Sequence, residues 1–224
     1  PTFNIAGTYK QSAGDFRGIQ NNTTYTAGVP SFQIGSVNFT GGVFIANYSC
    51  NPVSSTISYV VAGNMNISFS NTTDLFAIHR LATLSTTAAT AKLFMQVGGD
   101  FTISGVLGEF NSNNATGSEV VNLLGSFNVS GGNNYFNVIP NYGGNGHALA
   151  LTINGSVAIS GGNTYLSSES GLLTANLQGN LTVSGGALTL KGSPGVASIN
   201  LVNNFLQSAG NVNIYNNLTV TSAD

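Results

Sequence analysis

The sequence contains little charge: only 12 of its 224 residues are Asp, Glu, Lys or Arg, and the formal net charge is -2. Nucleic-acid binding needs a basic surface, which five scattered cations do not supply. Disorder usually accompanies low hydrophobicity and high net charge, whereas 42% of this chain is hydrophobic. We therefore expect a folded protein with a continuous apolar core and no nucleic-acid partner.

Cysteine and histidine are also scarce. Cys50 is the only cysteine, so no disulfide can form within the chain, and a small buried residue is its simplest interpretation. Neither His79 nor His147 has a second histidine or a nearby cysteine at ligand spacing. The glycine-rich residues 143–146 lack the Lys-Ser/Thr pair of a phosphate-binding loop. The sequence therefore predicts no metal site, no cofactor and no catalytic residues.

Long apolar runs are absent, and so are an initiator methionine and a signal peptide. A membrane-spanning helix needs about 20 consecutive apolar residues. We accordingly expect no membrane span, and we interpret the chain as a processed form or an excerpt of a longer protein.

The main feature of the sequence is a repeated motif. The stretch Leu-Gln-Gly-Asn-Leu-Thr-Val-Ser-Gly-Gly at 177–186 recurs, with variations, eight times along the chain. The third residues of the copies lie 24–36 residues apart, at Gly7, Gly35, Gly63, Gly99, Gly125, Gly155, Gly179 and Asn203. A period of roughly 20–50 residues is typical of solenoids, propellers and arrays.

Each copy alternates apolar and polar residues, as expected of a strand with one buried face. We call the third residue of each copy its anchor. The residue two places after each anchor is always apolar, and the residue four places after it is usually apolar. The sequence therefore predicts a core ladder made of Phe101, Phe127, Val157, Leu181, Phe205, Ile103, Val129, Ile159 and Val183. A small hydroxyl follows in every copy, which predicts a structural serine ladder at Ser104, Ser130, Ser160, Ser184 and Ser208. The Gly pair that usually comes next is suited to a turn.

The strand motif stays constant while the copy length varies, which favours coils whose insertions bulge from a corner. We predict an all-β protein, a parallel β-helix (β-solenoid) of about eight coils with 24–36 residues per coil. Residues 1–224 would form a single elongated domain with an irregular insert at about 69–96. Residues 75–84 carry apolar residues at helical as well as strand spacing, which allows a short helix or a lateral bulge there.

Parallel β-helices include polysaccharide lyases and glycosidases, which need clustered carboxylates. Asp74 and Glu109 have similar offsets in neighbouring coils, yet two solvated loop carboxylates are the simpler interpretation. Asp100 aligns with Asn and Ser in other copies, so we interpret it as a structural turn residue. Three tyrosines on adjacent coils could form an aromatic strip for sugars, although packing explains them more simply: Tyr135, Tyr142 and Tyr165. We predict that the protein is not an enzyme.

The phrases Gly-Asn-Leu-Thr-Val-Ser-Gly-Gly at 179–186 and Asn-Asn-Phe-Leu-Gln-Ser-Ala-Gly at 203–210 resemble repeats of very large secreted surface proteins of Bacteroidota. The resemblance covers nearly the whole chain and is clearest over residues 97–214. It implies export by the type IX secretion system, an extracellular or cell-surface location, and a role in adhesion.

The first hypothesis is therefore a structural segment of an extracellular adhesin, fibre or surface-layer protein. Neither end carries a polar capping unit, so adjoining repeats or identical copies stacked head to tail are the expected partners. The alternative is a carbohydrate-active β-helix, an enzyme or a binding module, with cell-surface or environmental polysaccharide as partner. Binding of ice by flat Ser or Thr arrays is less favoured, because the serine row precedes a turn.

Overall fold

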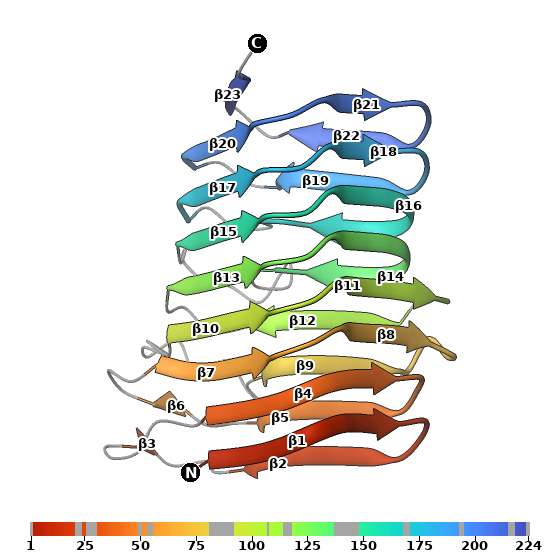
Figure 1. The fold of residues 1–224 in the computed structure, drawn as a ribbon, viewed down its shortest axis with the longest axis vertical. Helices are drawn as coiled ribbons and strands as arrows, with labels where there is room; N and C mark the ends of the chain where they lie inside the picture. Colours follow the sequence, from red (N-terminus) through yellow and green to blue (C-terminus); the bar gives the residue numbers. More distant parts are fainter. Residues whose placement is uncertain are drawn as a thin grey trace.

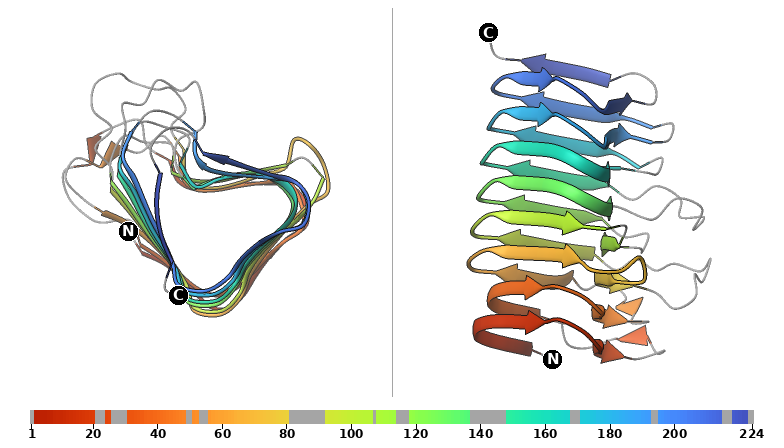
Figure 2. Two further views of the ribbon diagram at one scale, coloured as in Figure 1. Left: turned by 90° about the horizontal axis from the view of Figure 1, so that it is seen from above. Right: turned by 90° about the vertical axis from the view of Figure 1, so that its right-hand side faces the viewer.

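The computed structural model describes residues 2–20, 24–25, 31–48, 51–52, 56–80, 92–106, 108–113, 118–136, 148–167, 171–192, 195–214 and 218–222. Within these ranges the chain is all-β, and the strands stack in parallel as a β-solenoid (Figure 1). The predicted fold class is therefore confirmed. Seen along its axis, successive coils superpose in a single three-sided outline (Figure 2).

Each coil contributes a strand to each of three parallel ladders. The first ladder contains β1 (Thr2–Gln11), β4 (Ser31–Phe39), β7 (Thr56–Val61), β10 (Lys92–Val97), β13 (Glu119–Leu123), β15 (Leu149–Ile153), β17 (Leu173–Leu177), β20 (Ala197–Leu201) and β23 (Leu218–Ser222). The long strands β1 and β4 bend, so that their C-terminal halves begin the second ladder.

The second ladder continues through β8 (Met65–Phe69), β11 (Phe101–Gly105), β14 (Phe127–Tyr135), β16 (Val157–Tyr165), β18 (Leu181–Val183) and β21 (Phe205–Gln207). The third ladder contains β2 (Asp15–Gln20), β5 (Val43–Tyr48), β9 (Leu75–Arg80), β12 (Glu109–Asn113), the C-terminal halves of β14 and β16, β19 (Ala187–Lys191) and β22 (Asn211–Ile214). A separate pair joins β3 (Thr24–Tyr25) to β6 (Asn51–Pro52).

The predicted core ladder occupies the second ladder in register. Phe101 pairs with Phe127, and the column continues through Val157, Leu181 and Phe205. The neighbouring column contains Ile103, Val129, Ile159 and Val183. All these side chains are buried except Phe205, which is 48% exposed. The prediction that Phe205 is buried is therefore wrong, because β21 is the last described strand of the second ladder and no described strand covers it.

The serine row lies at the turn between the second and third ladders, but it is not one uniform ladder. A register shift in β14 pairs Ser130 with Gly161 rather than with Ser160. The hydroxyls of Ser104 and Ser160 donate to the carbonyl oxygens of Ile67 and Val129 in the preceding coil, at 3.5 and 3.2 Å. These serines therefore tie neighbouring coils together at the turn.

Glycine is required in the turn for two reasons. Gly162 has a φ of 69°, which side chains other than glycine rarely tolerate. A Cβ on the preceding Gly161 would lie 2.5 Å from the carbonyl oxygen of Ser130 in the coil below. The Gly pair therefore permits both the change of direction and the close approach of the coils.

The predicted irregular insert at about 69–96 is wrong in its described part. Residues 75–80 form strand β9, in register with β5 on one side and β12 on the other. Residues 92–97 form β10 in the first ladder. Helical spacing is misleading here because the four central residues of β9 are all buried, so residues of both faces of the strand are covered. Residues 81–91 lie outside the described ranges.

A second aromatic column, which the repeat pattern does not predict, fills the core beneath the third ladder. Phe16, Phe44, Phe76 and Phe110 are in register. The rings of Phe16 and Phe44 stack at 5.1 Å, and those of Phe44 and Phe76 at 4.4 Å. Their offsets from the repeat anchors vary, because the turn before the third ladder varies in length, and this variation hides the column in the sequence.

Candidate functional site

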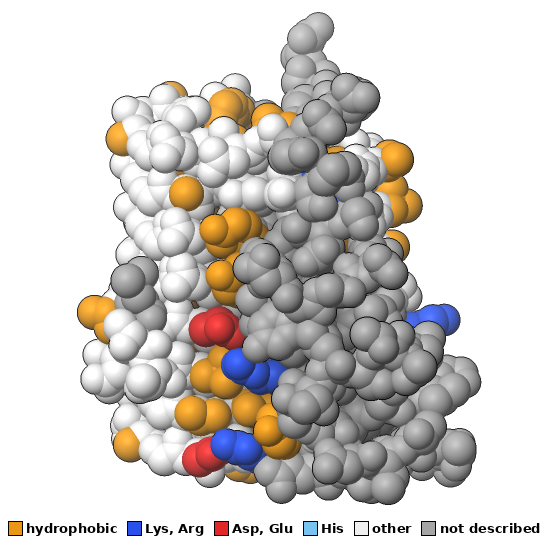
Figure 3. Space-filling model, turned by 180° about the vertical axis from the view of Figure 1, so that it is seen from behind, with side chains coloured by type: hydrophobic (Ala, Val, Ile, Leu, Met, Phe, Trp, Pro, Cys, Tyr) orange, Lys and Arg blue, Asp and Glu red, His pale blue; other side chains and the backbone are white. Residues whose placement is uncertain are grey.

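The outer side of the third ladder carries two ion pairs. Arg17 forms an ion pair with Asp15 at 2.9 Å, and its guanidinium lies 4.8 Å from the ring centroid of Tyr48. Further along, Arg80 pairs with Glu109 at 3.2 Å. Figure 3 shows two places on this side where acidic and basic side chains lie together. Each carboxylate is thus neutralised by a neighbouring guanidinium.

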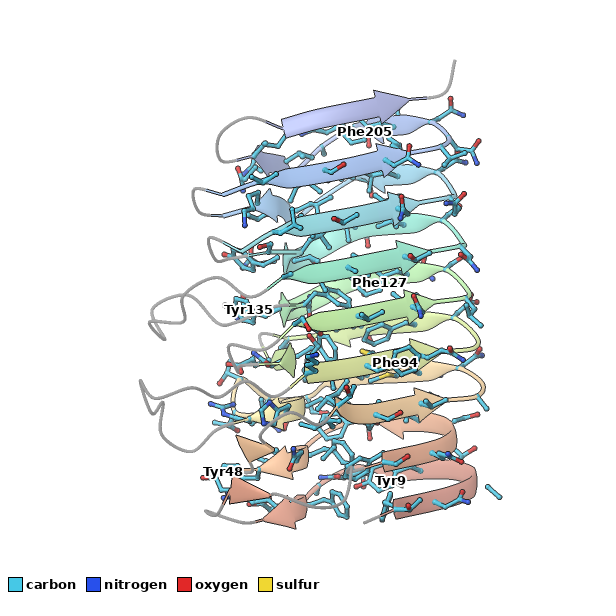
Figure 4. The ribbon with its side chains drawn as sticks, turned by 90° about the vertical axis from the view of Figure 1, so that its left-hand side faces the viewer. Tyr9, Tyr48, Phe94, Phe127, Tyr135 and Phe205 are labelled. Carbon is cyan, nitrogen blue, oxygen red and sulfur yellow. The ribbon has the colours of Figure 1, made fainter. Side chains whose placement is uncertain are left out.

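Tyr135 and Tyr165 occupy the same register position on β14 and β16 of this ladder. Their rings stack on one another, with centroids 5.0 Å apart and an interplanar angle of 11°. Tyr48 and Tyr135 lie on the same side of the solenoid (Figure 4). Because stacking covers one face of each ring with the other tyrosine, this pair offers a sugar less ring surface than separate tyrosines would.

Asp74 is not the solvated loop residue that the sequence suggested. Its carboxylate is buried and accepts hydrogen bonds from the backbone N–H groups of Gly42, Ser70 and Asn71 at 2.6–2.8 Å. Burial alone raises the pKa of Asp74, but these donors outweigh it and the pKa is lowered. Asp74 therefore closes the turn between β8 and β9.

Glu109 begins strand β12, and its backbone N–H donates to the carbonyl oxygen of Asp74 at 3.0 Å. The two acids therefore lie on neighbouring coils, as the sequence suggested. Burial raises the pKa of Glu109, and Arg80 offsets part of that increase. Since one carboxylate is held by backbone donors and the other by an arginine, the two do not form an acid–base pair facing a common space.

Asp100 has the structural turn role that its alignment predicted. Its backbone N–H donates to Oδ1 of Asn64 at 3.0 Å, and its own Oδ1 accepts from the N–H of Ser126 at 2.8 Å. The same bond recurs between Asn180 and Asn204 at 3.3 Å. These side chains thus link the turns of consecutive coils.

Polar groups for which the repeat pattern gives no indication are buried where the third ladder meets the first. Lys191 is fully buried in β19, and its ammonium donates to Ser167 Oγ at 3.2 Å and to the carbonyl oxygen of Gly171. His79 is also buried, in register with Asn47. The sequence gives little signal for these residues, because each lies in a different coil.

Glu119 is the most unusual of these groups. It lies in the first ladder between Leu93 and Leu149, and it is 1% exposed. Neither of its carboxylate oxygens has a hydrogen-bond partner in the described part of the chain. Burial raises the pKa of Glu119 well above the ordinary value, and the neighbouring Ser112 hydroxyl offsets only part of this effect. The side chain is therefore best accommodated as a neutral acid.

The two ends of the described solenoid differ from its sides because they expose core positions. At the C-terminal end, Phe205 and Ile214 are each 48% exposed. An apolar cavity opens there, lined by Leu181, Leu190, Ile199, Leu201, Phe205, Val212 and Ile214. At the N-terminal end Phe3, Ile5, Tyr9 and Phe16 are only partly buried.

Comparison of the chain with protein-family models, with curated proteins and with solved structures finds no match. Among the described residues, no group of three or more His, Cys, Asp or Glu side chains is arranged to hold a metal ion. The same residues include no helix long and apolar enough to cross a membrane. Cys50, Tyr142 and His147 lie outside the described ranges.

Proposed function

We propose that this chain is a structural segment of an extracellular adhesin, fibre or surface-layer protein, whose coils are continued end to end by further coils. The main support for the proposal is a difference in burial between the middle and the C-terminal end of one core column. Phe127 is fully buried, whereas Phe205, in the same register column, is 48% exposed. A further coil would cover Phe205 as β14 is covered in the middle of the solenoid.

The unpaired strand edges support the same proposal. In a parallel ladder each strand bonds to the strands of the coils before and after it. The last described strands of the second and third ladders, β21 and β22, have a partner on one side only. Free edges of this kind template further strand pairing. Adjoining repeats of a longer chain and identical copies stacked head to tail both meet that requirement.

Location and export form part of the proposal. The resemblance of residues 97–214 to repeats of type IX-secreted surface proteins of Bacteroidota supports an extracellular or cell-surface location. An adhesin also needs a ligand, and cell-surface or environmental polysaccharide is the proposed class. A head-to-tail contact does not close on itself, so assembly of copies would give filaments.

Association of the purified chain tests the proposal. We expect light scattering to show oligomers that lengthen with concentration, and negative-stain microscopy to show rods. Phe205→Asp combined with Ile214→Asp should weaken this association, because charges would be buried at the contact. The matched control is Gln33→Asp with Asn38→Asp, which places two charges on exposed residues of the flank. A dispersed monomer at high concentration, with end-coil amides protected from hydrogen exchange, would contradict the proposal.

The carbohydrate-active alternative has weaker support. Charged and aromatic residues do line the outer side of the third ladder, but Arg17 and Arg80 pair with acids, and Tyr135 stacks on Tyr165. We therefore expect the purified chain to release no products from pectin, alginate or similar polysaccharides above background, measured as reducing ends and unsaturated sugars. Cleavage that disappears in Glu109→Gln would favour the alternative instead.

A further inference from the structure

The outer side of the first ladder is a regular face in the middle of the solenoid. Five successive strands, β10, β13, β15, β17 and β20, pair there in parallel and in continuous register. By contrast, register shifts interrupt the pairing of β14 with β16 and of β19 with β22. Figure 4 looks onto this side of the solenoid, where Phe94 is labelled. We call the outward side chains of these five strands the first-ladder face.

Outward residues of this face form two rows that run along the solenoid axis, because every second residue of a strand points outward. The central row contains Phe94, Val120, Ala150, Thr174 and Ser198. The amide row, two residues further along each strand, contains Gln96, Asn122, Thr152, Asn176 and Asn200. All these side chains are at least partly exposed. Members of a row follow one another at about 4.8 Å, and the rows lie about 6.6 Å apart.

Large apolar side chains are exposed on this face. Val120 in the central row is 39% exposed, and Leu172 and Val196 at the edge of the face are 48% and 69% exposed. Leu172 and Val196 lie in consecutive coils, where their carbonyl oxygens accept from the N–H groups of Leu149 and Leu173. Neighbouring exposed apolar side chains of this kind mark a surface that binds a partner.

Charge is almost absent from the same face. Lys92, at one edge, is the only charged residue that these five strands turn outward, because Glu119 points into the core. A charged polymer would therefore find almost no counter-charge here. The amide row instead offers groups that both donate and accept hydrogen bonds, as sugar hydroxyls do. The composition thus favours an uncharged partner that is rich in hydroxyl groups.

We propose that the first-ladder face binds an uncharged, extended polysaccharide of the β-1,4-glucan type, whose chain lies along the solenoid axis. The apolar C–H faces of its sugar rings pack on the central row, and its hydroxyls exchange hydrogen bonds with the amide row. The coil spacing of about 4.8 Å is close to the length of one sugar in such a chain. Successive sugars therefore meet equivalent positions of successive coils. This inference rests on the proposed adhesin function and names its ligand and its binding face.

A second copy of the chain fits this face less well. Five strands of five or six residues cover roughly 400 Å², from about 4.8 Å per strand and about 3.3 Å per residue. A stable protein interface buries about 800 Å² on each partner. A polysaccharide needs no such area in a single contact, because weak contacts along one chain add together.

Retention of the purified chain on microcrystalline cellulose tests the proposal. We expect the protein to be depleted from solution by cellulose, to be released by soluble cello-oligosaccharides, and to stay in solution with alginate gel. Asn122→Ala combined with Asn176→Ala should weaken retention roughly tenfold, because two hydrogen-bonding groups are lost. The matched control is Asn66→Ala with Asn128→Ala, which removes two outward amides from the second ladder. Circular dichroism checks that each variant retains its strands.

Three results would overturn the inference. The first is an equal loss of retention in the two pairs of variants, and the second is retention on alginate as strong as on cellulose. The third is a dimer in sedimentation that Val120→Asp abolishes, without retention on cellulose, because it would assign the face to a second copy.

The variant Phe205→Asp with Ile214→Asp separates this inference from end-to-end assembly. Both substitutions lie away from the first-ladder face, so dispersed monomers of this variant should still bind cellulose. Binding by such monomers supports the inference whether or not the unsubstituted chain forms filaments. Filaments of the unsubstituted chain that do not bind cellulose would overturn the inference and leave the assembly intact.

Discussion

Phe127→Ala is expected to lower the free energy of unfolding by about 3–5 kcal/mol, because it removes a large buried side chain from the middle of the solenoid. The ring of Phe127 lies 5.3 Å from that of Phe101 and 5.1 Å from that of Phe136, centroid to centroid. Aromatic pairs of this kind contribute beyond the area they bury. The neighbouring coils cannot collapse into the cavity without breaking the register of their ladders. Urea denaturation followed by circular dichroism measures the loss.

Phe205→Ala is the matched control for this experiment. It makes the same chemical change in the same column, but its side chain is 48% exposed whereas Phe127 is fully buried. In a solution of monomers, we therefore expect Phe205→Ala to lower the free energy of unfolding by much less than Phe127→Ala does. Equal losses at the two positions would contradict the exposed C-terminal end. If copies associate, the loss at Phe205 should grow with protein concentration, because association covers that residue.

Glu119 is expected to make stability fall as pH rises. Burial raises its folded-state pKa well above the ordinary value of 4.5. Below pH 4.5 Glu119 is protonated in both the folded and the unfolded chain, so its ionisation does not reduce the free energy of unfolding there. As pH rises from 4.5 towards the folded-state pKa, the unfolded chain releases this proton and the folded chain keeps it. Stability then decreases by up to about 1.4 kcal/mol per pH unit for this one group.

Two substitutions isolate that effect. Glu119→Gln should remove the pH-dependent loss, and Glu119→Leu should also stabilise the protein at neutral pH, since its register neighbours are Leu93 and Leu149. Asp15→Asn is the matched control, because the Asp15 side chain is about half exposed and paired with Arg17. Denaturation between pH 5 and pH 9 measures all four proteins. If Glu119→Gln has the same pH profile as the unsubstituted protein, a neutral buried Glu119 is ruled out.

The second ladder could be predicted from the sequence because its signal is local. Each copy combines period-two alternation, from Phe127 to Val129 for example, with a serine and a glycine pair that fix the turn. Repetition then implies stacking, because one coil cannot bury its apolar face alone. The turn role of Asp100 followed from the same alignment, since the side chains of Asn64, Asp100 and Asn180 each accept a hydrogen bond from a backbone N–H of the next coil.

The third ladder could not be predicted in the same way. The aromatic column from Phe16 to Phe110 has variable spacing from the repeat anchors, and β9 is covered on both faces. A strand covered on both sides loses its alternation, so its sequence fits a helix as well. The stacking of Tyr135 on Tyr165 likewise depends on register between coils rather than on any motif.

The formation of coils could be read from the sequence, because alternation, turn chemistry and period are properties of short segments. The environment of individual side chains could not. Asp74 accepts a hydrogen bond from the N–H of Gly42 in the neighbouring coil, Glu119 is buried between Leu93 and Leu149, and Phe205 is exposed although its equivalents are buried. These environments depend on residues of other coils, which are distant in sequence and which stacking brings to about 4.8 Å.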